Sequence, residues 1–356
     1  MELRDRLQST LGIAYTIQEE LGGGGMSRVF VAEERALGRR VVVKVLPPEL
    51  TGGVNIDRFR REILTCARLQ HPHIVPVLTA GELEGLPYYT MPLEEGRSLR
   101  ARLLESGALP IAEAIGILGD VAKALAFAHA RGVVHRDIKP DNVLVCGDAA
   151  VVTDFGIAKA LAASTLEAGN GAALTHIGMA MGTPAYMAPE QAAADPAMDH
   201  RADIYAFGCM AYELLSGRPP FMNPSPQKLL AAQMSQRPQP IGELRRDAPP
   251  LLCTLVMRCL EKDPADRPQQ ASEIVHLLDT VATGDWPAVH PPARPTPRQT
   301  LGRALAIYSL AFIPVAILAE WVIVTLALPP WLLSVALVLM VLALPVTIAR
   351  ITRQRH

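Results

Sequence analysis

The sequence has few charged residues and almost no excess of either sign. Of its 356 residues, 19% are Asp, Glu, Lys or Arg, and the formal net charge is −1. A balanced charge gives no electrostatic reason to expect a nucleic-acid partner, because phosphate backbones attract strongly basic surfaces. We therefore expect no nucleic acid among the partners of this chain.

Cysteine is also scarce, and its spacing fits neither a disulfide framework nor a metal site. The chain has no CxxC pair and no histidine at ligand spacing from a cysteine. Its five cysteines are Cys66, Cys146, Cys209, Cys253 and Cys259. An odd number of scattered cysteines is typical of buried free thiols in a reducing compartment.

Charge is nearly missing from one long C-terminal stretch. Between Ala304 and Ala349 the single acidic or basic side chain is Glu320. The turn LPPW divides this stretch into residues 304–328 and 331–349, each near the ~20 residues needed to cross a bilayer. We expect two transmembrane helices in a hairpin. The alternative, a buried helical pair in a soluble domain, would show a polar face.

Arginines flank the predicted hairpin on both sides. A proline-rich linker, residues 280–303, precedes it and a basic tail, residues 350–356, follows it, whereas the turn carries no charge. The positive-inside rule then places both termini in the cytoplasm. The first ten residues are too polar for a signal peptide. The sequence thus predicts a multi-pass membrane protein whose N-terminal part is cytoplasmic.

Hydrophobic patterning divides the rest of the chain into two parts. Residues 14–93 hold short β-type runs (RVFVAE, RRVVVKVL and PYYTMPL) and one helical segment near 54–69. Residues 94–279 are dominated by helical patterns. This asymmetry predicts a small sheet-rich lobe and a larger helical lobe with a ligand between them. Residues 1–13 are an N-terminal extension.

Four consecutive glycines lie between two β-type segments, in the stretch LGGGGMSRV. This position indicates a glycine-rich hairpin rather than the strand-to-helix turn of a dinucleotide-binding fold. Glycines let backbone N–H groups approach phosphates closely, although a flexible linker would explain them as well. The residues of the stretch are Leu21, Gly22, Gly23, Gly24, Gly25, Met26, Ser27, Arg28 and Val29.

Lys44 lies in the middle of a β-branched run, where a lysine either snorkels from a sheet edge or is held by a buried partner. In the helical segment, Glu62 falls on the apolar face defined by Phe59, Ile63 and Cys66. A carboxylate turned inward needs a cation, because an unpaired buried charge is costly. We therefore expect Lys44 and Glu62 to form an ion pair.

Two apolar strands end in oxygen-bearing side chains. The stretch VVHRDIKPDN contains Asp137 and Asn142, and AAVVTDFG ends in Asp154. Asn142 and Asp154 are side chains that can hold Mg²⁺ against phosphates, since magnesium prefers one or two protein oxygens beside those of the substrate. Asp137 then remains to orient a hydroxyl group.

These motifs, in this order and spacing, resemble the bacterial branch of the eukaryotic-type (Hanks-type) serine/threonine protein kinases. The resemblance covers residues 14–279 and rests on GGGGMSRV, VVVK, Glu62, HRDIKPDN, DFG, GTPAYMAPE and Arg267 in DPADRP. It implies the α+β, two-lobed protein kinase fold, with the transmembrane hairpin added. It also implies transfer of the γ-phosphate of ATP, with Mg²⁺ or alternatively Mn²⁺, to serine or threonine of protein substrates.

The resemblance further implies a role for each matching residue. Lys44, paired with Glu62, would contact the α- and β-phosphates, Asp137 would accept the proton of the substrate hydroxyl, and Lys139 would steady the γ-phosphate. Asn142 and Asp154 would bind the metal. Besides the glycine-rich stretch, the nucleotide would contact Val42, Met91, Pro92, Glu94 and Leu144. Proline at position 92 is compatible because this position is expected to offer only its carbonyl.

Other matching residues imply structural and regulatory roles. Glu190 would pair with Arg267, and Asp203 would brace the loop that carries Asp137. Because Arg136 directly precedes Asp137, phosphate on the loop that includes residues 160–175 would neutralise that arginine. Thr175 is the preferred acceptor, followed by Ser164 and Thr165, and Thr183 together with Lys139 is typical of serine/threonine specificity.

The sequence leaves other functional hypotheses open. A pseudokinase scaffold would bind nucleotide and partner proteins without transferring phosphate, although the complete set of catalytic residue types argues against it. The predicted hairpin would either anchor an enzyme to the bacterial cytoplasmic membrane or itself sense the bilayer. A homodimer of the kinase domain is a further expectation that the pattern leaves undecided.

Overall fold

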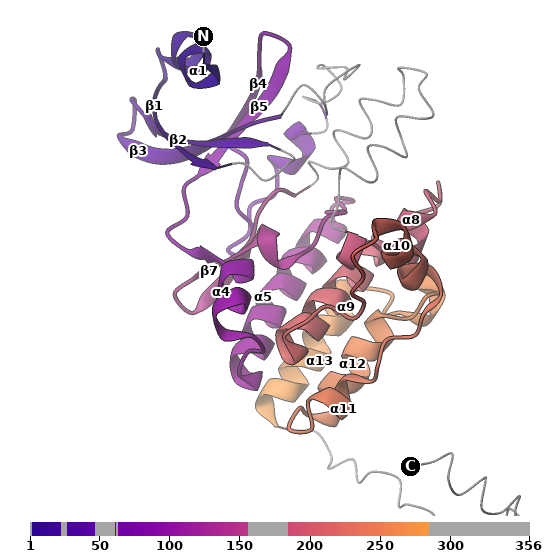
Figure 1. Cartoon of the computed structure of the whole chain (residues 1–356). Coiled ribbons are helices and arrows are strands. Elements are labelled where there is room, and N and C mark those ends of the chain that lie inside the picture. Colours follow the sequence, from indigo (N-terminus) through magenta and orange to yellow (C-terminus); the bar gives the residue numbers. More distant parts are fainter. Residues whose placement is uncertain (1, 23–26, 47–60, 62, 156–183, 285–356) are drawn as a thin grey trace, which may run out of the picture. The chain divides into compact units, whose positions relative to one another are not determined.

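The structure is a computed structural model of the whole chain, and it describes residues 2–22, 27–46, 61, 63–155 and 184–284 (Figure 1). The chain divides into two compact units, Met1–Pro287 and Ala288–His356. Within the described residues, no helix combines the length and apolar character needed to span a bilayer. Both predicted transmembrane segments, the basic tail and most of the linker lie outside the described residues.

Five antiparallel strands form the sheet of the N-terminal part. Three of them, β2, β3 and β5, are the β-type runs recognised in the sequence. The strands are β1 (Tyr15–Gly22), β2 (Arg28–Glu34), β3 (Arg39–Val45), β4 (Thr79–Leu83) and β5 (Leu86–Pro92). They lie in the order β1-β2-β3-β5-β4.

The two faces of this sheet bury different side chains because the strand period is two. Val41 and Val43 of β3 belong to a cluster on one face, which helix α1 (Leu3–Leu11) covers with Leu7 and Leu11. The N-terminal extension therefore contains a helix that packs on the sheet. Val42 belongs to the cluster on the opposite face, and the alternation places Lys44 on that same face.

The second cluster joins the sheet to the helical segment around Ile63. Its buried members are Val42, Leu46, Ile63, Val75, Tyr89 and Met91. Residues 61 and 63–66 are helical, and Ile63, Cys66 and Leu69 are all buried. The predicted apolar face of this segment is therefore confirmed for its described members, whereas Phe59 and Glu62 lie outside the described residues.

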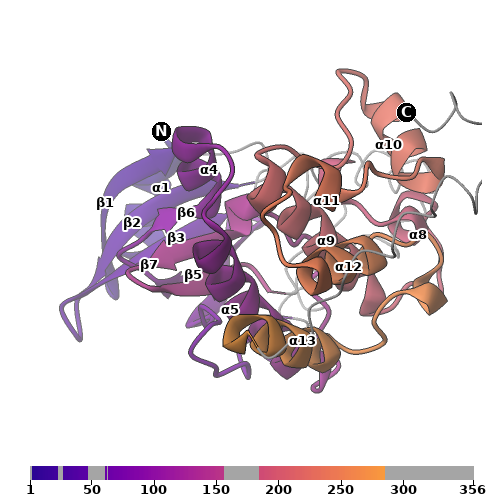
Figure 2. The same ribbon diagram turned by 90° about the horizontal axis from the view of Figure 1, so that it is seen from below.

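The helical part is built around α9, which is buried at every position from Ala202 to Leu215. Helix α13 packs on α5 and helix α12 packs on α9 (Figures 1 and 2). The helices of this part are α4 (Leu99–Ser106), α5 (Ile111–His129), α8 (Pro189–Ala192), α9 (Arg201–Ser216), α10 (Pro226–Ser235), α11 (Ile241–Leu244), α12 (Pro250–Cys259) and α13 (Ala271–Thr283), with 3-10 turns η1 (Pro140–Asn142), η3 (Pro184–Tyr186) and η4 (Pro264–Asp266).

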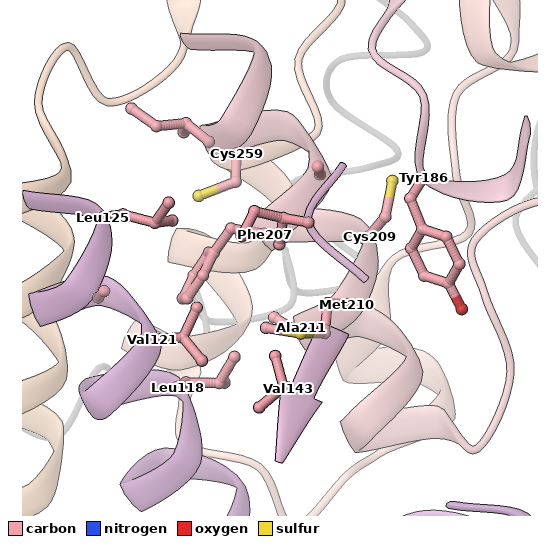
Figure 3. Packing of buried hydrophobic residues seen from close by; sticks show 14 of the residues in the cluster. Leu118, Val121, Leu125, Val143, Tyr186, Phe207, Cys209, Met210, Ala211 and Cys259 are labelled. Carbon is pink, nitrogen blue, oxygen red and sulfur yellow. The ribbon is translucent and has the colours of Figure 1, made fainter. Parts of the chain in front are cut away.

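The core of the helical part is tightly packed around Phe207 of α9. Its ring lies near Val121 and Leu125 of α5 and near Cys259 of α12 (Figure 3). A Cβ atom added to the neighbouring Gly208 would lie 2.7 Å from the Cβ of Cys259. The close contact of α9 with α12 thus depends on glycine at this position.

A second, three-stranded sheet is flanked by Asn142 and Asp154, the two predicted metal ligands. Strands β6 (Arg97–Ser98), β7 (Val143–Cys146) and β8 (Ala149–Val152) pair in that order. Val143 pairs with Val152, so Asn142 before β7 and Thr153 after β8 are opposite each other. The N–H of Thr153 donates to the carbonyl of Asn142 at 2.9 Å, and this bond brings the two predicted metal ligands, Asn142 and Asp154, to the same end of the sheet.

The prediction of buried free thiols is confirmed for three of the five cysteines, and the other two are free but only partly buried. All five cysteines are free; Cys66, Cys209 and Cys259 are buried, whereas Cys146 and Cys253 are half-buried. Burial raises the pKa of the Cys209 thiol above its usual value, so this thiol stays protonated at neutral pH.

Candidate active site

Asp137 lies in the loop between α5 and β7, where two neighbours hold its carboxylate. Lys139 Nζ donates to Asp137 Oδ2 at 2.7 Å, and Asn142 Nδ2 donates to the same oxygen at 3.0 Å. Asn142 Nδ2 also donates to the backbone carbonyl of Asp137 at 2.7 Å. The structure therefore brings together three of the predicted site residues.

The surroundings of Asp137 act on its acidity in opposite directions. Burial raises the pKa of the carboxyl, while Lys139, His135 and Asn142 lower it, and the net pKa lies above the usual value. A raised pKa makes this carboxylate a better proton acceptor than an exposed aspartate. The donors nevertheless favour the ionised form that a base requires.

Asp154 follows β8 and is held by two donors from the other sheet. Lys44 Nζ lies 2.6 Å from Asp154 Oδ2, although 110 residues separate the two in sequence. The hydroxyl of Tyr89 donates to Asp154 Oδ1 at 2.8 Å. Burial would raise the pKa of Asp154, but Lys44 and Tyr89 outweigh it and hold the pKa below its usual value.

The donor set at this end of the sheet fits a magnesium ion. Both bonds of the Asn142 amide use Nδ2, and its oxygen Oδ1 takes no part in them. Asp154 is ionised, as its lowered pKa requires. Among the described residues, no group of three or more His, Cys, Asp or Glu side chains is placed to hold a metal. One carboxylate and one amide oxygen match the few protein ligands that Mg²⁺ takes when phosphates supply the others.

Asp203 of α9 braces the loop that carries Asp137, as the resemblance implied. Its side chain has no exposed surface, and its two oxygens accept the N–H of His135 at 2.8 Å and the N–H of Arg136 at 2.7 Å. His129 Nε2 lies 2.8 Å from Asp203 Oδ2. The backbone of Arg136 has φ of 69°, a conformation that is unfavourable for residues with a side chain. The two bonds to Asp203 hold the loop in this conformation.

The predicted pair of Glu190 and Arg267 is also present. Arg267 NH1 and NH2 donate to the two oxygens of Glu190 at 2.6 and 2.8 Å. Nearby, the side-chain amide of Gln191 donates to the carbonyl of Arg136 at 2.9 Å. Helix α8 is thus tied both to the end of the helical core and to the loop of Asp137.

Residues predicted to contact the nucleotide base gather on the second face of the large sheet. Val42 and Met91 are paired across β3 and β5 and are buried in the same cluster, with Val29 and Leu93 packed against it. Val151 packs against this cluster as well, and Leu144 is its partner across β7 and β8. Leu144 therefore lies beside a residue that packs on the cluster of Val42.

The remaining predicted nucleotide residues lie at the ends of strands. Pro92 ends β5 opposite Val41, and Glu94 follows in the connection to β6. At the other end of the sheet, Leu21 and Gly22 end β1, and Ser27 precedes β2. The guanidinium of Arg28 is bound to Glu20 at 2.6 Å on the surface.

Several predicted residues lie outside the described residues, so their predicted contacts stay predictions. The expected ion pair of Lys44 with Glu62 is one of these; among the described residues, Lys44 pairs with Asp154. The others are Gly23, Gly24, Gly25 and Met26 of the glycine-rich stretch and Ser164, Thr165, Thr175 and Thr183 of the regulatory loop.

Sequence reasoning missed two features beside this site. The first is the bond of Tyr89 to Asp154. The only feature of the sequence that could have indicated it is a hydroxyl group within an apolar strand. The second is Tyr186, whose hydroxyl bonds to both Arg100 and Glu213. Arg100 NH1 also donates to Glu213 Oε1 at 2.7 Å, and its Nε donates to Asp141 at 3.2 Å. A buried glutamate in an otherwise apolar helix, here Glu213, was the signal that could have revealed this network.

Lys44 of the sheet-rich part contacts Asp154 of the helical part, and Asp137 lies in a loop of the helical part. This arrangement defines a protein kinase domain. The comparison of sequences agrees: the chain belongs to the protein kinase domain family, which matches residues 15–278.

Similar proteins include a probable serine/threonine-protein kinase of Corynebacterium efficiens, 38% identical over 278 residues, which are 75% of this chain and 41% of that protein. Serine/threonine-protein kinase PknB of Mycobacterium tuberculosis is 38% identical over 285 residues, 78% of this chain and 44% of the relative. The serine/threonine-protein kinase pkn2 of Myxococcus xanthus is 38% identical over 274 residues, 74% of this chain and 32% of the relative. The matched part thus spans less than half the length of each of these relatives.

Proposed function

We propose that the chain is an ATP-dependent protein kinase that transfers the γ-phosphate to serine or threonine hydroxyls of proteins. The observation that carries this proposal is the pair of contacts Lys44–Asp154 and Lys139–Asp137, which place two cations beside two carboxylates at one site. Phosphoryl transfer asks a protein mainly for positioning and charge compensation, and these side chains supply both.

Asp137 is the proposed acceptor of the substrate proton. Its Oδ2 is already engaged by Lys139 and Asn142, whereas Oδ1 takes no part in these bonds. We therefore assign Oδ1 as the atom that receives the proton. Lys139 Nζ, beside it, is placed to offset negative charge on the transferred phosphate.

Asn142 and Asp154 would hold the metal, and Lys44 would contact the nucleotide phosphates. When bound, Mg²⁺ neutralises charge on the phosphate oxygens. Lys44 already contacts Asp154, so the amine that would bind phosphate and the carboxylate that would bind metal are adjacent. The same relationship would serve with Mn²⁺.

Radiolabelled phosphate tests the activity directly. The full chain, purified in detergent and given ATP labelled at the γ-phosphate, should label itself or a generic protein substrate. Asp137→Asn should lower the rate about 10²- to 10⁴-fold, because it removes the proton acceptor. The matched control is Asp141→Asn, four residues away in the same loop, where the carboxylate is 46% exposed and bonded to Arg100. Equal labelling by wild type and Asp137→Asn would contradict the assignment.

The same experiment separates the kinase from the pseudokinase scaffold. A scaffold would bind ATP without transferring phosphate in the wild-type chain. Analysis of the labelled amino acids then tests the specificity for serine and threonine, and mapping of labelled peptides tests Thr175 as the site of autophosphorylation. Label confined to tyrosine would contradict the proposed specificity.

We also propose that residues 304–349 anchor the kinase domain to the bacterial cytoplasmic membrane, from whose inner face it signals. The support is the sequence alone, in which two apolar runs are flanked by arginines. Cell fractionation of the full chain and of a chain that ends at residue 303 tests the anchor. Recovery of both chains in the soluble fraction would contradict it. Sedimentation of the purified chain would test whether the domain pairs as a homodimer.

A further inference from the structure

Tyr89 contacts the carboxylate to which the proposed function assigns the metal. Its hydroxyl donates to Asp154 Oδ1 at 2.8 Å, while Lys44 Nζ lies 2.6 Å from Asp154 Oδ2. Each oxygen of Asp154 is therefore held by a different donor. The three side chains form one chain of contacts, Tyr89–Asp154–Lys44.

The packing of Tyr89 leaves its hydroxyl little freedom. The residue is 2% exposed and belongs to the cluster that includes Val42, Ile63 and Met91. Tyr89 is also directly opposite Lys44 in the register of β3 and β5, so the two side chains leave the sheet on the same face. One strand pair thus presents an O–H and an N–H donor side by side to the same carboxylate.

The backbone of Asp154 has an uncommon conformation, in which the two donors fix the direction of its carboxylate. Asp154 has φ of 64°, in the left-handed region that residues with a side chain seldom adopt. A rotation of its side chain would change where the carboxylate oxygens point. Two donors at fixed positions, one on each oxygen, prevent that rotation.

The contacts leave room for a metal. An ionised carboxylate offers about four lone-pair sites, of which Lys44 and Tyr89 occupy two. As far as the described residues go, one site on each oxygen remains for a cation. Groups that hydrogen-bond to metal ligands commonly orient them and strengthen metal binding.

Resting on the proposed function, we propose that Tyr89 is a positioning residue, which orients Asp154 for Mg²⁺ through its hydroxyl. The phenol does not itself contact metal or nucleotide. Its removal should weaken metal binding and leave the contacts of Lys44 with nucleotide phosphates in place.

Metal binding measured without turnover tests this proposal. The full chain is mixed with a non-hydrolysable ATP analogue, and Mn²⁺ is titrated while free Mn²⁺ is followed by electron paramagnetic resonance. Tyr89→Phe should raise the Kd for Mn²⁺ about tenfold, since loss of such a supporting contact commonly costs 10- to 100-fold in metal affinity. Binding of the analogue without metal should change less than twofold.

Two further variants show whether the effect belongs to the bond with Asp154. Tyr88→Phe is the matched control, because Tyr88 is the neighbouring tyrosine of β5 and packs against the cluster on the opposite face. It should leave the Kd for Mn²⁺ unchanged. In an Asp154→Asn background, Tyr89→Phe should have no additional effect on Mn²⁺ binding, because the oriented carboxylate is gone.

The outcomes separate this inference from the proposed function. An unchanged Kd for Mn²⁺ in Tyr89→Phe, or tighter binding because the hydroxyl competes with the metal, would overturn the inference alone. If Tyr89→Phe weakens Mn²⁺ binding but the wild-type chain transfers no phosphate, the inference is supported and the kinase activity is contradicted. A wild-type chain that binds no Mn²⁺ with the analogue would overturn both. Thermal unfolding without metal detects a folding defect, and a variant whose Tm falls while its Kd for Mn²⁺ stays the same would also count against a positioning role.

Discussion

Arg267 is buried without any exposed surface and uses its whole guanidinium to hold Glu190 and the surrounding backbone. Two of its bonds reach the oxygens of Glu190, at 2.6 and 2.8 Å. Its other bonds reach the carbonyls of Glu261, Arg201 and Lys262 at 2.8, 2.9 and 3.0 Å. A bidentate pair with this many further acceptors fixes α8 to the segment that precedes α13.

Replacing Arg267 should destabilise the domain strongly. Arg267→Met leaves Glu190, whose side chain is 9% exposed, without its cation, and it leaves three carbonyls without this donor. Removal of one partner of a buried pair commonly costs about 3 to 5 kcal/mol of unfolding free energy. Urea unfolding measures this loss.

The control for that substitution is Arg258→Met. Arg258 lies 3.9 Å from Glu273, and the two side chains are 47% and 39% exposed. A surface pair of this kind contributes about 0 to 1 kcal/mol. Similar losses in the two variants would mean that the Glu190–Arg267 pair does not hold the fold together.

Asp203→Asn should disturb the loop that carries Asp137. The amide has one acceptor oxygen in place of two, so an N–H of His135 or Arg136 loses its acceptor. Each buried donor left unsatisfied costs about 1 to 3 kcal/mol. We expect a lower unfolding free energy and slower phosphate transfer, measured on the same preparation. Asp199→Asn, at the start of α9 and 39% exposed, should change both by much less.

Lys262 should make stability depend on pH in the alkaline range. Burial lowers the pKa of its amine to about 8, and the amine donates to Tyr205 and to the carbonyl of Gln233 at 2.8 and 2.7 Å. An unfolded lysine titrates at about 10.4. Between these values the unfolded chain binds more protons than the folded chain, so the unfolding free energy rises with pH.

The comparison with Lys262→Met isolates this effect. From about pH 7.5 to pH 10.5, wild type should gain about 1 to 2 kcal/mol relative to the variant, less than full linkage would give because the side chain is partly exposed. Lys228→Met, on the exposed side of α10, should follow wild type at every pH. A wild type that loses stability relative to Lys262→Met over this range would show that the sign is wrong.

Tyr186→Phe tests the network that joins η3 to α9. The change removes a hydroxyl that bonds to Arg100 and Glu213 and leaves the direct bond between those two residues at 2.7 Å. We expect a loss of about 1 to 3 kcal/mol, with faster amide exchange in residues 184–188. Tyr212→Phe removes a hydroxyl that donates to one backbone carbonyl at 3.0 Å and should cost less. Equal losses would contradict a special role for the network.

The sequence by itself determined the local elements and most of the candidate site. A β-branched run marked strand β3 and a helical period marked helix α5, because both patterns report burial of apolar side chains. The spacing of motifs selected Asp137, Lys139, Asn142 and Asp154, which depend on short loops at the ends of strands. Their roles followed from chemistry that local sequence carries.

The tertiary structure alone decided which side chains contact one another when they are far apart in the sequence. Period two places Val42 and Lys44 on one face of β3, but it does not say that this face meets Asp154, or that Tyr89 supplies the second donor. The pairing of Tyr89 with Lys44 depends on strand register, and the contact with Asp154 depends on how the two sheets pack. Neither the register nor the packing can be predicted from a short stretch of sequence, because both depend on residues far apart in the chain that are buried together.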